Sequence, residues 1–147
     1  MTLFAIYAPD GQIVQSNKVY VPDDGKYDAQ LDEMGHQFVK TESPGLLPPD
    51  HWFVDVNAKE ICERPIMHTI EANKTRIMCG DKDSCLITGI PKKATARITM
   101  RDGTEVYPSF VLDAEQLEIS IPVPCAYRVH LDLWPYKTFT VDIEATA

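Results

Sequence analysis

The histidines are the first residues of this chain whose type could support metal binding or acid–base catalysis. No two of them stand at a metal-ligand spacing, and the sequence contains no His-Glu-x-x-His motif. A metal or catalytic role requires convergent partners, so we interpret these residues as surface histidines. They are His36, His51, His68 and His130.

The four cysteines offer a second kind of chemistry. Cys79 and Cys85 enclose a short polar segment, and a disulfide between them would close a hairpin. No two cysteines have the CxxC-like spacing of a zinc site. Without a secretion signal reduced thiols are expected, so the sequence favours four free cysteines and leaves the pairing of Cys79 with Cys85 open. Cys125 and His130 stand five apart on one expected strand, which directs them to opposite faces and argues against a catalytic pair.

The segment around Asp81, Asp83 and Ser84 has the residue types of a calcium loop. An EF-hand would need a longer loop that ends in glutamate, so we expect a solvated turn instead. The sequence also lacks a Gly-x-Ser-x-Gly elbow and a glycine-rich phosphate loop. We therefore predict no catalytic, cofactor-binding or metal-binding residues, and we predict that the protein is not an enzyme.

Exposed aromatic and apolar side chains are the remaining candidates for binding. Strand alternation places Trp134 on a polar face, and aromatic rings at loop tips can stack on sugars or anchor a protein interface. The alternative for Trp134 is packing under a neighbouring segment, because tryptophan is highly buried on average. The proline-containing segment 40–50 carries two adjacent leucines, and exposed apolar residues on a stiff loop would suit docking. The predicted interaction residues are Leu46, Leu47, Tyr107, Trp134 and Tyr136.

Composition narrows the classes of partner. The chain has 147 residues, a net charge of −8 and a pI near 4.9. Its basic residues are scattered, with only Lys92 and Lys93 adjacent, and phosphate neutralisation needs a clustered positive surface. We therefore exclude nucleic acid as a partner. No apolar run approaches the roughly 20 residues of a membrane span, and the start lacks a signal-peptide pattern. We expect a soluble, cytoplasmically made protein without membrane insertion.

Alternation of apolar and polar residues indicates the elements that must position these side chains. Tyr127, Val129, Leu131 and Leu133 share one face of an expected strand, while the residues between them are mostly polar. This is the pattern of a half-buried antiparallel strand. From Ile66 onward, short strands separated by turn signals predict an immunoglobulin-like antiparallel β-sandwich, with a small barrel as the competing layout. The expected strands are 67–72, 75–79, 84–89, 94–100, 105–112, 116–122, 125–134 and 137–145.

The first part of the chain predicts a small β-rich unit with one helix. An apolar strand at 3–8 and a returning strand at 12–21 flank a Pro-Asp-Gly turn, which predicts a hairpin. An aspartate cap at Asp23 or Asp24 precedes a helix whose buried face would carry Tyr27, Leu31 and Met34. Further strands are expected at 37–41, 51–56 and 61–63, with Trp52, Val54 and Val56 on one face. Pro65 cannot donate to a β-ladder, so we predict one domain over residues 1–65 and a second over 66–147.

Two groups of motifs carry a family resemblance. The opening 3–14 with its Tyr-Ala-Pro-Asp-Gly turn, the segment Trp52–Asp55 and the Glu63–Met67 step resemble small tail-region proteins of bacteriophages and prophages. The second group is similar to a Gly-x-Pro, Gly-x-Tyr-x-Val and Pro-Tyr pattern of those proteins and of carboxypeptidase-regulatory-like sandwiches. It comprises 86–91, 96–98, 124–129 and 135–136. Cys125 stands where the pattern has the second glycine, which is a departure at the turn before that strand.

The resemblance implies a virion structural component near the tail or its fibres, made in the host cytoplasm, without catalytic residues or cofactors. Its partners would be other tail or fibre proteins and, by analogy with the symmetry of tails, copies of itself. Two alternatives stay open. One is a module that binds host surface glycan through Trp134, Tyr136 or Tyr107, and the other is a tail-fibre assembly chaperone.

Overall fold

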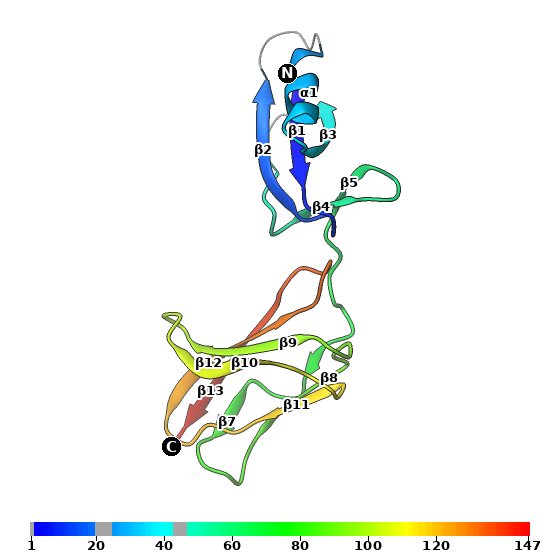
Figure 1. Ribbon diagram of the computed structural model, residues 1–147. Coiled ribbons are helices and arrows are strands. Elements are labelled where there is room, and N and C mark those ends of the chain that lie inside the picture. Colours follow the sequence, from blue (N-terminus) through cyan, green and yellow to red (C-terminus); the bar gives the residue numbers. More distant parts are fainter. Residues whose placement is uncertain (1, 20–24, 43–46) are drawn as a thin grey trace. The chain divides into compact units, whose positions relative to one another are not determined.

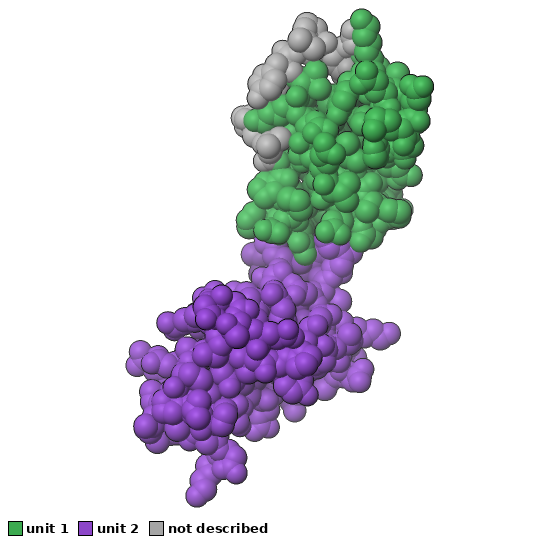
Figure 2. Space-filling model, turned by 60° about the vertical axis from the view of Figure 1, so that its left-hand side comes forward, with its two compact units in different colours: residues 1–64 green, residues 65–147 purple. Residues whose placement is uncertain are grey.

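The computed structural model describes residues 2–19, 25–42 and 47–147. Its contacts divide the chain into two compact units, residues 1–64 and 65–147, which Figure 2 shows in separate colours. Pro65 belongs to the second unit, where its carbonyl accepts a hydrogen bond from the Lys137 N–H at 2.7 Å. The division therefore falls one residue before the predicted boundary. The prediction of a mainly β protein with antiparallel sheets is confirmed.

The described residues of the first unit form a three-stranded antiparallel sheet, one helix and a two-stranded hairpin (Figure 1). The predicted N-terminal hairpin is confirmed as the β1–β2 pair, and β3 pairs with the other side of β1. The elements are β1 (Thr2–Tyr7), β2 (Ile13–Val19), α1 (Lys26–Glu33), β3 (Gln37–Glu42), β4 (Trp52–Asp55) and β5 (Glu60–Glu63).

Strand β1 is buried on both of its faces. Phe4 and Ile6 point to one face and pack against Leu31 of α1. Ala5 points to the other face and packs against Ile13 of β2 and Val54 of β4. A strand covered on both sides reads as a continuous apolar run, which explains the Leu-Phe-Ala-Ile segment.

Two details of the predicted first unit are wrong. Met34 does not lie on the buried helix face, because α1 ends at Glu33 and Met34 is 69% exposed at its C-cap. Val56 is likewise 37% exposed, because β4 ends at Asp55 and the chain turns away from the core that holds Val54. The structure places Gly25 at the helix N-cap, without a side-chain cap. The predicted capping aspartates lie outside the described residues.

The second unit consists of two sheets around one core. The larger sheet has the order β10-β9-β12-β13-β7, with β7 parallel to β13 and the other pairs antiparallel. The smaller sheet has the order β11-β8-β6. The strands are β6 (Glu71–Ala72), β7 (Arg76–Met78), β8 (Cys85–Thr88), β9 (Thr95–Met100), β10 (Glu105–Val111), β11 (Gln116–Ile119), β12 (Cys125–Asp132) and β13 (Phe139–Thr146).

The alternation in β12 produces one buried face, as the sequence predicts. Val129 and Leu131 are fully buried and meet Ile87 and Ile119 of the smaller sheet in one core. The expected strand over 67–72 is mostly absent, because the Ile70 N–H bonds back to the Met67 carbonyl in a turn and only Glu71–Ala72 pair. The immunoglobulin-like assignment of this unit stays a prediction. Within the described residues, no helix has both the length and the apolar content that a membrane crossing requires.

Gly89 is a position where the fold of the second unit requires glycine. Its φ is 72°, and a Cβ there would collide with the Thr69 carbonyl oxygen. The Thr69 hydroxyl also donates to the Gly89 carbonyl at 2.8 Å, which holds the two segments together. Gly103 has a similar φ of 92°, but an added Cβ would meet open space.

We expect Gly89→Ala to lower the free energy of unfolding by about 2 kcal/mol or more, since it adds a backbone collision to the left-handed strain. Gly103→Ala carries the strain alone and should cost about 1 kcal/mol. Urea unfolding in a Trp52→Phe background would measure both, because Trp134 in the second unit then reports the transition. Equal losses for the two variants would contradict the role given to the Thr69–Gly89 contact.

Candidate functional site

The outward face of the larger sheet carries an ordered set of charges. Arg128 on β12 stands opposite Asp142 on β13, and its Nε and Nη2 donate to the two carboxylate oxygens at 2.8 and 3.2 Å. These hydrogen bonds lower the pKa of Asp142 and raise the pKa of Arg128. Arg101 Nε lies 3.8 Å from the same carboxylate. Two guanidinium groups therefore share one acid.

His130 lies on the same face of β12, two residues after Arg128. Its Nε2 lies 3.1 Å from the Thr99 hydroxyl, and Thr99 is only 4% exposed although it points away from the core. Burial, followed by the charge of Arg97, lowers the pKa of His130. We therefore expect a neutral imidazole at neutral pH. His130 faces outward as predicted, but it is partly buried and hydrogen-bonded.

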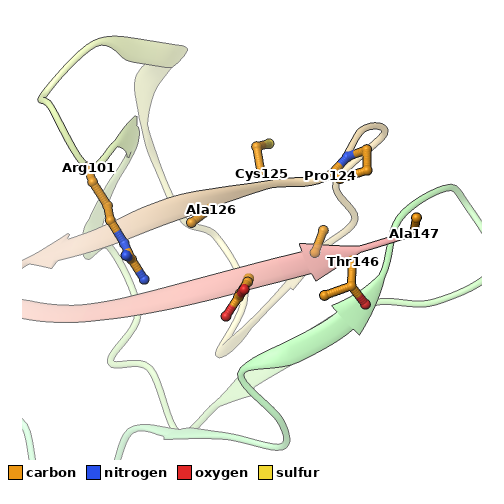
Figure 3. A pocket seen from close by; sticks show the side chains of 8 residues that line it. Arg101, Pro124, Cys125, Ala126, Thr146 and Ala147 are labelled. Atoms are coloured by element: carbon orange, nitrogen blue, oxygen red, sulfur yellow. The ribbon is translucent and has the colours of Figure 1, made fainter.

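A pocket of about 480 Å³ lies over this face, at the start of β12 and the end of β13. Ala126 is small, so a hollow forms between the longer side chains of Arg101 and Glu144. Figure 3 shows Arg101 on the side of the sheet to which Ala126 points, whereas Cys125 points to the other side. Arg101 and Glu144 give this pocket one positive and one negative side chain. The pocket is lined by Arg101, Pro124, Cys125, Ala126, Glu144, Ala145, Thr146 and Ala147.

The edge strand β10 of the same sheet carries exposed apolar side chains. Tyr107 and Val111 are 57% and 58% exposed, and Val106 is 37% exposed. The Tyr107 ring stands edge-on to Phe110, with ring centroids 5.6 Å apart. Tyr107 also borders a cleft of about 260 Å³ where β10 and β11 approach each other, with Tyr127 as its second tyrosine. Burial raises the pKa of Tyr127, so its hydroxyl stays protonated.

The structure does not gather the predicted interaction residues into one site. Trp134, which is 36% exposed, and Tyr136 share the turn between β12 and β13, where the Tyr136 N–H donates to the Leu133 carbonyl. Tyr107 lies on β10 instead. Leu47 belongs to the first unit and lines a pocket of about 350 Å³ with Val14. Leu46 lies outside the described residues.

Sequence reasoning missed Tyr127 as a surface residue. Alternation correctly placed it on the core-facing side of β12, but only the position of β11 shows that a cleft opens there. The exposure of β10 could have been predicted from the sequence. Its run Val106-Tyr107-Pro108 contains a proline, which is typical of an edge strand.

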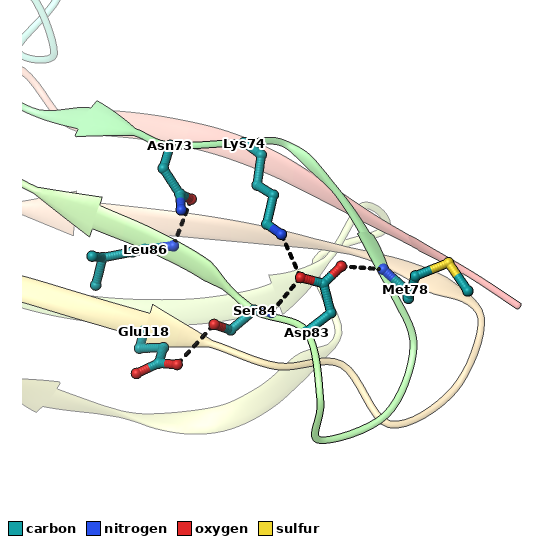
Figure 4. Close-up of polar contacts among 7 residues, drawn as sticks. All are labelled: Asn73, Lys74, Met78, Asp83, Ser84, Leu86 and Glu118. Atoms are coloured by element: carbon teal, nitrogen blue, oxygen red, sulfur yellow. Dashed lines mark hydrogen bonds and ion pairs between the residues drawn. The ribbon is translucent and has the colours of Figure 1, made fainter.

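The Asp81–Ser84 segment, which has the residue types of a calcium loop, is held by contacts within the protein (Figure 4). The Asp83 carboxylate accepts hydrogen bonds from the Lys74 ammonium, from the Met78 N–H at 2.8 Å and from the Ser84 N–H at 3.0 Å. The Ser84 hydroxyl donates in turn to Glu118 on β11 at 2.7 Å. Among the described residues no three His, Cys, Asp or Glu side chains group as a metal site. All four cysteines are free, and burial raises the pKa of Cys85.

The Asp83 contacts predict a pH dependence of stability. The hydrogen bond from Lys74, then that from Met78, lowers the pKa of Asp83 below its usual 3.8. A group with a lowered folded-state pKa stabilises the fold above its unfolded value and loses this contribution as pH falls through the folded value. The melting temperature of Asp83→Asn should therefore lie below that of the wild type at about pH 6 and approach it near about pH 3. The matched variant is Asp81→Asn in the same exposed loop, which should follow the wild type throughout. A gap for Asp83→Asn that widens on acidification would be incompatible with these contacts.

Comparison with protein-family models, with curated proteins and with solved structures gives no match to this chain.

Proposed function

We propose that this chain is a non-enzymatic structural protein of a bacteriophage virion, a tail or tail-fibre-associated adaptor that acts through protein–protein interfaces. The observation that carries this proposal is the exposed edge strand β10, with Val106, Tyr107 and Val111 at its surface. In the described part of the chain β10 pairs only with β9. An edge strand with exposed apolar residues is a surface that a protein partner covers favourably.

The backbone of β10 favours a partner that docks through side chains. The pairing with β9 shifts register twice, between Glu105 and Tyr107 and again between Tyr107 and Phe110. Pro108 lies inside the second shift and has no N–H to offer to an added strand. Continuous strand addition is therefore disfavoured, whereas an interface of apolar side chains remains favourable.

The surroundings of β10 have the composition of an interface rim. Glu105 begins the strand opposite Thr99, beside the charged face that holds Arg128 and Asp142. Apolar residues surrounded by polar ones are the usual arrangement of a specific protein interface. The resemblance of the Tyr-Ala-Pro-Asp-Gly opening and of the Gly89–Pro91 step to phage tail proteins supports a virion partner. Such partners are other tail or fibre proteins and further copies of this chain.

Replacement of Val111 by lysine tests this proposal. We expect mass spectrometry of purified particles to detect the wild-type chain and to find Val111→Lys reduced at least about tenfold, a loss of about 1.4 kcal/mol in binding. The stability of the variant should change by no more than about 0.5 kcal/mol, because Val111 is exposed. Val123→Lys is the matched control, since Val123 is 56% exposed but lies outside β10.

Two results would count against this assignment. Absence of the wild-type chain from mature particles would remove the virion role, and its presence on immature fibres alone would favour an assembly chaperone. Equal incorporation of Val111→Lys and Val123→Lys would show that β10 is not the interface.

A further inference from the structure

The first unit contains a second kind of surface, a polar pocket of about 470 Å³. It lies at the end of the three-stranded sheet where β1 ends and β3 begins. The last turn of α1 contributes from one face of the sheet, and the turn between β4 and β5 contributes from the other. The lining residues are Tyr7, Asp32, His36, Gln37, Phe38, Val56 and Lys59.

The lining combines hydrogen-bond donors and acceptors with one lysine and one aspartate. Tyr7, His36 and Gln37 can both donate and accept, Lys59 only donates, and the Asp32 carboxylate only accepts. Phe38 and Val56 add apolar surface. A ligand that fits carries an acceptor or anionic group for Lys59, a hydroxyl for Asp32, and an apolar surface. A few polar groups converging over apolar surface is the usual composition of a small-molecule site.

The backbone at Lys59 supports a binding role for this turn. Lys59 has a φ of 56°, a left-handed conformation that glycine adopts at lower cost. The turn is well defined, because the Lys59 N–H donates to the Asp55 carbonyl at 2.7 Å and the Asp55 carboxylate accepts from the Asn57 N–H at 3.0 Å. The turn therefore carries a lysine ammonium where glycine would be the less strained choice. Lys93 has a similar φ of 69° but does not line this pocket, so a left-handed lysine does not by itself mark a binding site.

We propose that this pocket binds a small hydroxyl-bearing anion, a monosaccharide with a carboxylate or phosphate group. Lys59 and His36 engage the anionic group, Asp32 accepts a hydrogen bond from a ring hydroxyl, and Val56 lies against the apolar face of the ring. The net charge of −8 opposes the anion at longer range. The expected dissociation constant is therefore about 1 mM, and binding should weaken as salt is added.

Titration of the full chain by amide NMR tests the proposal with four probes: glucuronate, glucose 6-phosphate, glucose and inorganic phosphate. Glucuronate and glucose 6-phosphate should shift the amides of His36, Gln37 and Lys59 and bind at least about fivefold more tightly than glucose, a gain of about 1 kcal/mol. Inorganic phosphate should bind more weakly than both, because it has no ring. Whichever of the two sugar anions binds more tightly identifies the anionic group.

Lys59→Gly is the decisive variant, because glycine suits the left-handed backbone and removes only the side chain. It should reduce the affinity for both sugar anions to that for glucose, while the matched variant Lys93→Gly leaves it unchanged. Asp32→Asn should weaken the binding of glucose, because an amide oxygen is a weaker acceptor than a carboxylate. The proposal fails if no sugar shifts these amides, if Lys59→Gly and Lys93→Gly behave alike, or if phosphate binds as well as glucuronate. None of these outcomes depends on whether the chain is found in virions.

Discussion

Burial of one face of the β12–β13 pair against the smaller sheet is the constraint around which the second unit is built. Val129, Leu131 and Ile143 are fully buried, and they meet Ile87 from β8. Each such side chain contributes about 1.5–3 kcal/mol relative to exposure, which is large beside the marginal net stability of a small unit. Because strand side chains alternate, this burial also directs Arg128, His130 and Asp142 to the opposite face. The core thus determines which side of the sheet can carry charge.

The first unit also buries apolar strand residues, but it covers its central strand on both faces. Its central strand β1 needs cover on both faces, which α1 supplies through Leu31 and the β4–β5 hairpin supplies through Val54. The polar pocket borders both of these layers at the end of the sheet. Asp32 from the helix side and Lys59 from the hairpin side both line it, together with Tyr7 and Gln37. The helix and the hairpin need apolar contact with β1 only along the middle of the strand. The end of the strand is therefore left for polar residues, and the pocket forms there.

Sequence reasoning succeeded where a property depends on one strand alone. The alternation around Val129 gave the buried face of β12, and the Pro-Asp-Gly turn gave the first hairpin. It failed where a property depends on where an element ends, as at Met34, which follows the last residue of α1. It also failed where a property depends on which strands become neighbours, as at the cleft beside Tyr127. Asp32 and Lys59 lie far apart in the sequence, and no periodicity relates them. Only tertiary packing brings them to one pocket.

The candidate sites in both units lie at strand ends, on an edge or on an outward sheet face, and the reason is the small size of each core. A unit of this size buries too little apolar surface to leave an inner face of its sheet open for a ligand. The inner faces are therefore used for stability, and binding groups are confined to edges and turns. There a side chain is fixed by local backbone contacts, as the turn at Lys59 is fixed by Asp55 and the segment at Asp83 by Met78. Binding surfaces of this kind can change in sequence without loss of the fold, because their residues take little part in the core.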